Sequence, residues 1–333
     1  MTMKYVSLKV KLILSLLAIS LLPALAQQLN GHWRNQKTEK SVNATMVVTA
    51  HNIADKLDRN LFERYGDVQA FGYNLVVEHK DSWYKTGHGD NQIVAAMNNY
   101  VAAYGIYSVM IFVDTLGKVI AVNDRDKSGK ELNTNFFYEE DFGNAQWFKD
   151  ALEGRFTTKE GYLSGTVIED VYGDPHVVRT YGGTGKTIGF SAPVKDSQGN
   201  LLGVWKNFAD FGLVKDIVRD DIKTLASEGT KSSLIAVVSR GGETLLSMNS
   251  SGDTSTNWAA GSAKSWYERA VRGETASGET TLDNEERVIG FAPLVGAMGY
   301  AGMNWTVIAT ATTAEVHAAI DEAFGKARVE GIG

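Results

Sequence analysis

The sequence has no cysteine among its 333 residues and only four prolines. The missing cysteines exclude disulfide frameworks, zinc–thiolate sites and cysteine nucleophiles. Because prolines are so few and no low-complexity run occurs, we expect no long disordered linker. The chain also lacks a basic excess: its formal net charge is −6. This charge argues against nucleic acid as a partner, since nucleic-acid binding needs a basic face.

What the chain does contain is enough apolar material for a sizeable core. Hydrophobic residues make up 44% and aromatic residues 10% of the sequence. A chain of this length corresponds to about two domains of about 150 residues each.

The N-terminus combines a basic start with an uncharged stretch, residues 12–31. One interpretation is a membrane anchor, which needs about 20 residues. The other is a cleaved signal peptide, which is typical of a short apolar core, here residues 12–26, that ends in the small-residue pattern Ala24-Leu25-Ala26. The organisation of the rest of the chain favours the anchor. Both interpretations place everything after Gly31 outside the cytoplasm.

Residues 29–73 contain no proline, and their apolar positions recur at helical spacing. These positions are Val42, Met46, Ile53, Leu57 and Leu61. The pattern predicts one long amphipathic helix of about 40 residues, which suits a stalk that continues from a membrane anchor. The alternative is two shorter helices that are broken near Asn52. A further helix is predicted over residues 91–104.

The strongest internal signal is a repeat. The segment 147–154 has the pattern W-[FY]-x-x-A-x-x-G, and this pattern returns at 266–273. A predicted hairpin at 108–123 returns at 234–246, and the segment 188–193 returns at 289–293. The order of these elements is the same both times, which predicts two related modules. Each module is an antiparallel sheet with a helix inserted between its strand pairs, so the fold class is α+β.

The two modules differ in one segment. The first has a long insertion, residues 155–186, between its helix and the strand at 187–194, and the second is shorter there. We interpret the insertion as a loop. Because loops often carry function, we expect the first module to bind the ligand.

These patterns together resemble the double Cache family of extracellular sensors. The resemblance covers nearly the whole chain and includes the long first helix, the two W-[FY]-x-x-A-x-x-G helices, the segments 190–194 and 203–207, and the late segment 302–305 before a terminal helix. It implies that each module is PAS-like, that the membrane-distal module binds a small metabolite, and that the terminal helix leads toward a second membrane span.

The resulting organisation has five parts. They are a membrane anchor or signal peptide (1–31), a helical stalk with a second helix (32–104), a membrane-distal ligand-binding module (105–228), a membrane-proximal module (229–312) and a terminal signalling helix (313–333).

Amino-acid sensors of this family resemble one another in two charged positions. An Arg two residues before the helix Trp binds the ligand carboxylate, and an Asp in the final strand of the distal module binds the ligand ammonium. This sequence has Ala145 and Phe208 there. Asn207 takes the Asp position only if the register differs by one residue. Because a buried carboxylate without a cation is costly, we expect that ordinary α-amino acids are not the ligand.

Six residues are candidates for ligand binding. For the aromatic ones the alternative is a place in the core, for Asp170 a solvated loop charge, and for Asn207 a structural hydrogen bond. The candidates are Trp147, Phe148, Tyr162, Asp170, Asn207 and Phe208. Trp266 and Tyr267, the counterparts of the first two, are expected to pack in the proximal core.

We expect no catalytic residue, metal site or cofactor. The six histidines are scattered without metal-ligand spacing, and no Gly-x-Ser-x-Gly elbow occurs. The segment 181–187 looks like a phosphate loop but has Thr180 where the pattern needs glycine, so we interpret it as a turn that leads into a strand.

The sequence therefore predicts a non-enzymatic sensor region of a bacterial transmembrane chemoreceptor at the inner membrane. Ligand binding would displace the terminal helix relative to the first helix, and a homodimer through the long helices is expected. The alternatives are the sensor region of a histidine kinase and a secreted periplasmic solute-binding protein. A hydrolase has little support because no nucleophile–base pair is visible.

Overall fold

The computed structural model describes residues 42 and 44–330, with side chains through residue 322. The first helix, α1, runs through residues 44–72 without interruption at Asn52. One face of it is buried along its whole length, from Met46 to Phe71, as the apolar spacing predicts. The alternative of two shorter helices is therefore wrong for this segment. The predicted helix start and the anchor or signal peptide lie outside the described residues.

The first module is a five-stranded antiparallel sheet in the order β2-β1-β5-β4-β3. Its strands are β1 (Tyr107–Asp114), β2 (Val119–Val122), β3 (Val167–Gly173), β4 (Lys186–Lys195) and β5 (Leu201–Asp210). Its helices are α2 (Gln92–Tyr104), α3 (Gln146–Glu153) and α4 (Pro175–Tyr181), with short 3₁₀ helices η1 (Leu75–Glu78), η2 (Lys80–Ser82) and η3 (Asn135–Glu139).

The two faces of this sheet carry separate cores. Because strand side chains alternate, Trp205 and Phe190 point toward α1 and α2, while Val204 and Phe208 point toward α3, η3 and α4. The face toward α3 is the one on which the candidate site lies.

The second module is a six-stranded antiparallel sheet in the order β8-β7-β6-β11-β10-β9. Helix α5 (Gly212–Ser227) leads into it from β5. Its other elements are β6 (Leu234–Ser239), β7 (Thr244–Asn249), β8 (Gly252–Asp253), η4 (Gly261–Ala263), α6 (Lys264–Val271), β9 (Ala276–Leu282), β10 (Glu285–Pro293), β11 (Trp305–Thr312) and α7 (Thr313–Glu330). Tyr267 belongs to the core of this module and Trp266 packs against it, as expected.

The fold class predicted from the repeat is confirmed: a long helix precedes two antiparallel sheets with inserted helices. The interpretation of residues 155–186 as a loop is wrong, because they contain β3 and α4. Strand β3 includes the adjacent acids Glu169 and Asp170 and a register shift against β4, so it lacks a clean apolar alternation. Helix α4 has only seven residues and begins at an Asp174 cap followed by Pro175.

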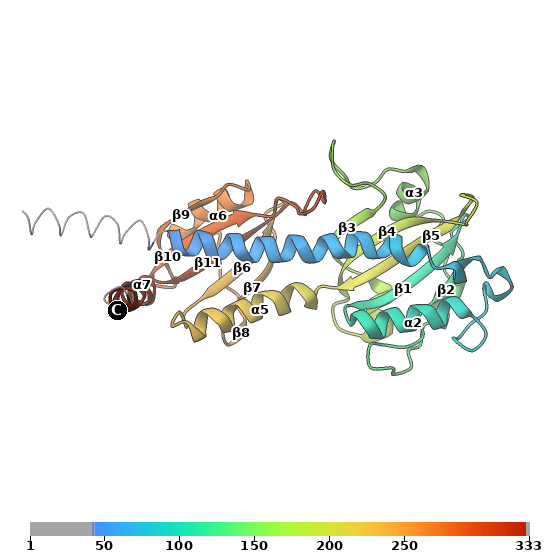
Figure 1. Cartoon of the computed structure of the whole chain (residues 1–333), viewed down its shortest axis with the longest axis horizontal. Helices are drawn as coiled ribbons and strands as arrows, with labels where there is room; N and C mark the ends of the chain where they lie inside the picture. The colour runs from blue at the N-terminus through green and yellow to red at the C-terminus, as the bar shows by residue number, and fades with distance from the viewer. Residues whose placement is uncertain (1–41, 43, 331–333) are drawn as a thin grey trace, which may run out of the picture.

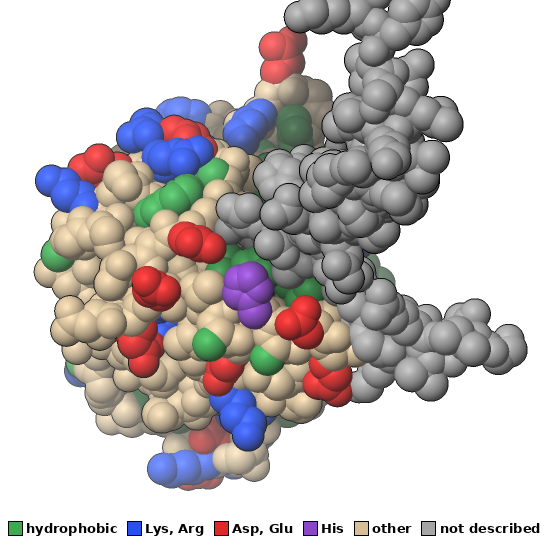
Figure 2. Space-filling view, turned by 90° about the vertical axis from the view of Figure 1, so that its left-hand side faces the viewer, with side chains coloured by type: hydrophobic (Ala, Val, Ile, Leu, Met, Phe, Trp, Pro, Cys, Tyr) green, Lys and Arg blue, Asp and Glu red, His purple; other side chains and the backbone are tan. Residues whose placement is uncertain are grey.

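Helix α1 runs along both modules (Figure 1). At one end its Gly72 contacts Val194 of β4, and near the other Met46 and Val47 contact Gly290 of β10. The start of α1 and helix α7 lie at the same end of the molecule (Figure 1). Viewed from that end, the surface shows acidic and basic side chains among small apolar areas (Figure 2). Within the described residues, no helix is long and apolar enough to cross a membrane.

Candidate functional site

The feature that stands out in the first module is a buried lysine in the middle of the sheet. Lys206 lies on β5 and is only 2% exposed. Its neighbours on the same strand face, Val204 and Phe208, belong to the core under α3. A buried ammonium is costly unless it is paired, so its partners define the site.

Glu169 of β3 forms an ion pair with Lys206, and its side chain is 30% exposed. The carboxylate reaches across β4 at Gly189. A methyl group at position 189 would overlap the Glu169 carboxylate and lie 3.2 Å from its Cβ. The absence of a side chain at Gly189 is therefore what allows the pair to form.

Aromatic rings from three elements surround the ammonium. Lys206 Nζ lies 4.6 Å from the Trp147 ring centroid, 4.5 Å from that of Phe208 and 5.6 Å from that of Tyr172. Such distances give cation–π attraction, which is stronger when the cation is desolvated. Burial lowers the pKa of Lys206, and the Glu169 carboxylate acts against this shift.

Ser191 of β4 lies directly opposite Lys206 in the antiparallel register, so both side chains point to the same face. It is fully buried, and within the described residues its hydroxyl oxygen has no hydrogen-bond partner. Buried polar atoms without partners are rare in folded proteins and mark sites that need explanation. We call Trp147, Glu169, Tyr172, Ser191, Lys206 and Phe208 the Lys206 cluster.

Two further titratable groups stand beside the cluster. Asp174 caps α4 by accepting hydrogen bonds from the backbone N–H groups of His176 and Val177, and His176 Nδ1 lies 3.3 Å from its carboxylate. Asp174 raises the pKa of His176. Burial raises the pKa of Asp174, but His176 and Val177 outweigh it and leave this pKa below its ordinary value. Burial also raises the pKa of Tyr172, and the Glu169 and Asp174 carboxylates add to this.

The structure brings three of the six predicted site residues together. Trp147, Phe148 and Phe208 lie in one core with buried side chains, and two of them contact Lys206. Asn207 faces the opposite side of the sheet, where its Oδ1 accepts a hydrogen bond from Trp205 Nε1 at 2.8 Å. The register therefore places Phe208, and not Asn207, on the face of the cluster.

The remaining two predicted residues lie away from the cluster. Tyr162 is 44% exposed in the segment between α3 and β3. Asp170 accepts a hydrogen bond from Trp305 Nε1 of the second module at 2.9 Å. Neither contacts the Lys206 ammonium.

Sequence reasoning did not find Lys206, Glu169, Tyr172 or Ser191. One signal was present: Lys206 interrupts an otherwise apolar strand, in the order Gly-Val-Trp-Lys-Asn-Phe-Ala. The partners of this lysine come from strands that are distant in sequence, and β3 itself was not predicted. These residues come together only through the order of the strands in the sheet, so the sequence alone does not group them.

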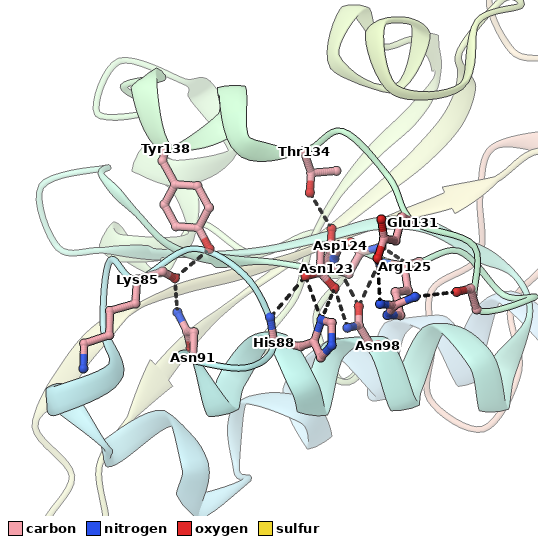
Figure 3. Close-up of polar contacts among 11 residues, drawn as sticks. Lys85, His88, Asn91, Asn98, Asn123, Asp124, Arg125, Glu131, Thr134 and Tyr138 are labelled. Carbon is pink, nitrogen blue, oxygen red and sulfur yellow. Dashed lines mark hydrogen bonds and ion pairs between the residues drawn. The ribbon is translucent and has the colours of Figure 1, made fainter.

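A second polar network lies at the β2 edge of this sheet, and Figure 3 shows its main contacts. Asp124 accepts hydrogen bonds from Asn98 Nδ2 at 2.7 Å and from the backbone N–H of His88 at 3.1 Å, and it pairs with His88 Nδ1 at 2.9 Å. Burial raises the pKa of Asp124, but these contacts outweigh it and lower this pKa. The polar groups satisfy one another and join the 83–91 segment to α2 and β2, which indicates a structural role.

A cleft of about 440 Å³ lies beside the glycine-rich turn 182–185. The turn joins α4 to β4, which confirms the interpretation of this segment as a turn that leads into a strand. Two lysines that line the cleft have partners in the second module: Lys186 donates to the Leu245 carbonyl at 2.6 Å, and Lys215 pairs with Asp253 at 2.6 Å. The cleft is thus part of the contact between the modules.

Among the described residues, no group of three His, Cys, Asp or Glu side chains is placed to hold a metal ion. The Lys206 cluster offers one cation, one carboxylate, two hydroxyl groups and aromatic rings. That set suits the binding of a small charged organic molecule.

No family model matches the chain, and no curated protein does. Its fold is similar to solved ligand-binding domains of chemoreceptors. The domain of Campylobacter jejuni Tlp3 in complex with L-norvaline aligns with a TM-score of 0.54 and 11% identity, over 84% of this chain and 94% of that one. The domain of Pseudomonas fluorescens CtaA in complex with L-isoleucine aligns with a TM-score of 0.50 and 13% identity, over 86% and 98%.

An extracellular ligand binding receptor from Desulfohalobium retbaense aligns with a TM-score of 0.49 and 15% identity, over 80% of this chain. The chain spans 40% of the length of that receptor. At these identities the likeness concerns the fold. At that level, the resemblance to double Cache sensors that the sequence predicts is confirmed.

Proposed function

We propose that this chain is the extracytoplasmic sensing region of a bacterial transmembrane chemoreceptor, and that its distal module binds a small metabolite at the Lys206 cluster. The observation that carries this proposal is a buried, aromatic-lined ion pair at the centre of the distal sheet. The supporting fold is that of chemoreceptor ligand-binding domains with TM-scores of 0.50 to 0.54. Those domains bind amino acids; here the ligand class follows from the residues of the cluster.

The arrangement of the helices supports signalling toward a membrane. The start of α1 and helix α7 lie at one end of the molecule (Figure 1). Ala44 and Val48 of α1, Leu225 of α5 and Ala319 of α7 line a common groove at that end. A change in the distal sheet transmitted through α5 would alter this three-helix contact, and a shift of α7 against α1 would carry the signal.

The test of ligand binding in the first module uses the equivalent position of the second module as its control. A thermal-shift screen of metabolites on the purified chain identifies a ligand, and calorimetry measures its affinity. Trp147 and Trp266 occupy the same place in the two modules, at the starts of α3 and α6. We expect Trp147→Phe to weaken binding by at least about tenfold, and Trp266→Phe to leave it unchanged.

Two results would contradict the proposal: no metabolite that stabilises the chain, or an affinity that depends on Trp266 and not on Trp147.

The extracytoplasmic location of the chain is tested separately. In cells with a permeabilised outer membrane and an intact inner membrane, added protease should cleave this chain. A cytoplasmic control protein in the same cells should stay uncleaved.

A further inference from the structure

We propose that Glu169 is an internal counter-ion that the ligand replaces, and that the ligand is therefore a small carboxylate whose anionic group pairs with Lys206. This inference rests on the proposed function and names the chemical class that the cluster takes. It goes beyond the fold, because it depends on a lysine, a glutamate and a glycine of this chain.

The two partners of the ion pair differ in how easily each of them can leave it. The Lys206 side chain is 2% exposed on a central strand, whereas the Glu169 side chain is 30% exposed near the sheet edge. Glu169 is on the edge strand, so rotation of its side chain takes its carboxylate toward water without a change in the sheet. Removal of Lys206 from its aromatic surroundings would require the sheet to open.

The difference in burial between Lys206 and Glu169 determines which charge the ligand must carry. A cationic ligand would have to compete with Lys206 for Glu169 while the lysine ammonium stays in place, and like charges in a buried site repel. An anionic ligand takes the place of Glu169, and the number of charges beside Lys206 stays the same. The exchange thus replaces one buried ion pair by another.

The remaining residues of the cluster suit a carboxylate with a short organic body. The Ser191 hydroxyl is buried opposite Lys206 and has no partner within the described residues, so it is free to donate to a second carboxylate oxygen. The Trp147 and Phe208 rings lie 4.6 and 4.5 Å from the Lys206 ammonium and offer apolar surface to the rest of the ligand.

The test is rescue by added carboxylate. Glu169→Ala removes the internal counter-ion, and its melting temperature should fall and then recover in a saturable way with sodium acetate or propionate. Ethylammonium chloride at equal ionic strength should give no recovery. The double variant K206M/E169A, which lacks the cation, should show no response to either salt.

A second measurement covers the case in which Glu169→Ala fails to fold. Glu169→Gln keeps the shape of the side chain without its charge. Calorimetric titration with acetate, propionate and benzoate should give at least about tenfold tighter binding to E169Q than to the unchanged chain. Equal affinities, or equal rescue of K206M/E169A, would overturn the inference.

The two proposals fail separately. A screen that finds an amine ligand which needs Trp147 would overturn the carboxylate class and leave the sensor function intact. Carboxylate rescue that depends on Lys206, in a chain that no metabolite stabilises, would leave the anion site intact and contradict the sensor function.

Discussion

Glu169 and Asp170 are consecutive on β3, yet their carboxylates serve different modules. Glu169 pairs with Lys206 in the first module, and Asp170 accepts a hydrogen bond at 2.9 Å from Trp305 Nε1 of the second module. Trp305 also packs edge-on against Phe211, at 6.3 Å between ring centroids, directly before α5. One short strand therefore contacts both the Lys206 cluster and the second module.

The unequal burial of the ion pair predicts unequal costs when either charge is removed. E169Q leaves the buried ammonium without a carboxylate and should lower the free energy of unfolding by about 3 kcal/mol. K206M leaves a carboxylate that turns into water, and Met fills the aromatic space, so it should cost about 1 kcal/mol or less. Urea unfolding at pH 7 measures both. A larger loss for K206M would show that Glu169 is the trapped partner.

Gly189 should tolerate no side chain, because a Cβ there meets Glu169. Gly189→Ala is expected to push the carboxylate off Lys206 and to lower the free energy of unfolding by about 2 kcal/mol. Gly66 in α1 is the matched control, since a Cβ there meets nothing within 4 Å. Gly66→Ala should stabilise the chain by about 0.5–1 kcal/mol through helix propensity. Equal effects of the two substitutions would contradict the packing that we describe at Gly189.

These contacts show how far the sequence alone could lead. The repeat predicted two antiparallel modules because the Trp helices and the hairpins keep their local patterns. The repeat did not predict β3. This strand is held in the sheet by its pairing with β4, and it carries two adjacent acids whose side chains contact different modules. Long-range pairing of this kind leaves little trace in local periodicity.

The hydrogen bond between Asp170 and Trp305 should couple the two modules energetically. Asp170→Ala and Trp305→Phe each remove one partner of this bond, and their effects on the free energy of unfolding should not add. A double-mutant cycle should give an interaction free energy of about 1–2 kcal/mol. Asp170→Ala combined with Trp266→Phe serves as the control pair. Additive effects for Asp170 and Trp305 would mean that this contact carries no coupling.

Asp58 on α1 predicts a pH dependence of stability at the contact between this helix and the second module. Its carboxylate accepts hydrogen bonds from the backbone N–H groups of Val295 and Gly296 at 2.8 and 2.7 Å. Burial raises its pKa from 3.8 to about 6. Because the folded-state pKa is the higher one, the stabilisation from protonated Asp58 is complete below about pH 3.8 and is lost as the pH rises through 6.

The measurement compares the unchanged chain with Asp58→Asn, in which this group does not titrate. The free energy of unfolding of the unchanged chain, relative to the variant, should fall by about 2 kcal/mol between pH 4 and pH 8. The neighbouring titratable groups, Asp55, Lys159 and Tyr300, are the same in both proteins and cancel in the difference. A difference that does not change with pH would place the pKa of Asp58 near its ordinary value.

The candidate site was only partly predictable for a related reason. Trp147 and Phe208 were predicted from the helix motif and the final strand, and both contact Lys206. The sequence reasoning looked for charged groups at two fixed positions and found Ala145 and Phe208. The structure holds a buried cation two residues from the second position and an acid on another strand. A buried cation is therefore present on this face of the sheet, where the sequence reasoning expected none. The expectation about amino acids then depends on whether a ligand ammonium finds a partner.

A crystal structure of the chain with a carboxylate from the screen tests the central claim most directly. Our account predicts the ligand carboxylate within hydrogen-bond distance of Lys206 Nζ, its body between Trp147 and Phe208, and Glu169 rotated toward solvent. A ligand bound in the second module or between the modules, with the Lys206–Glu169 pair intact, would contradict it.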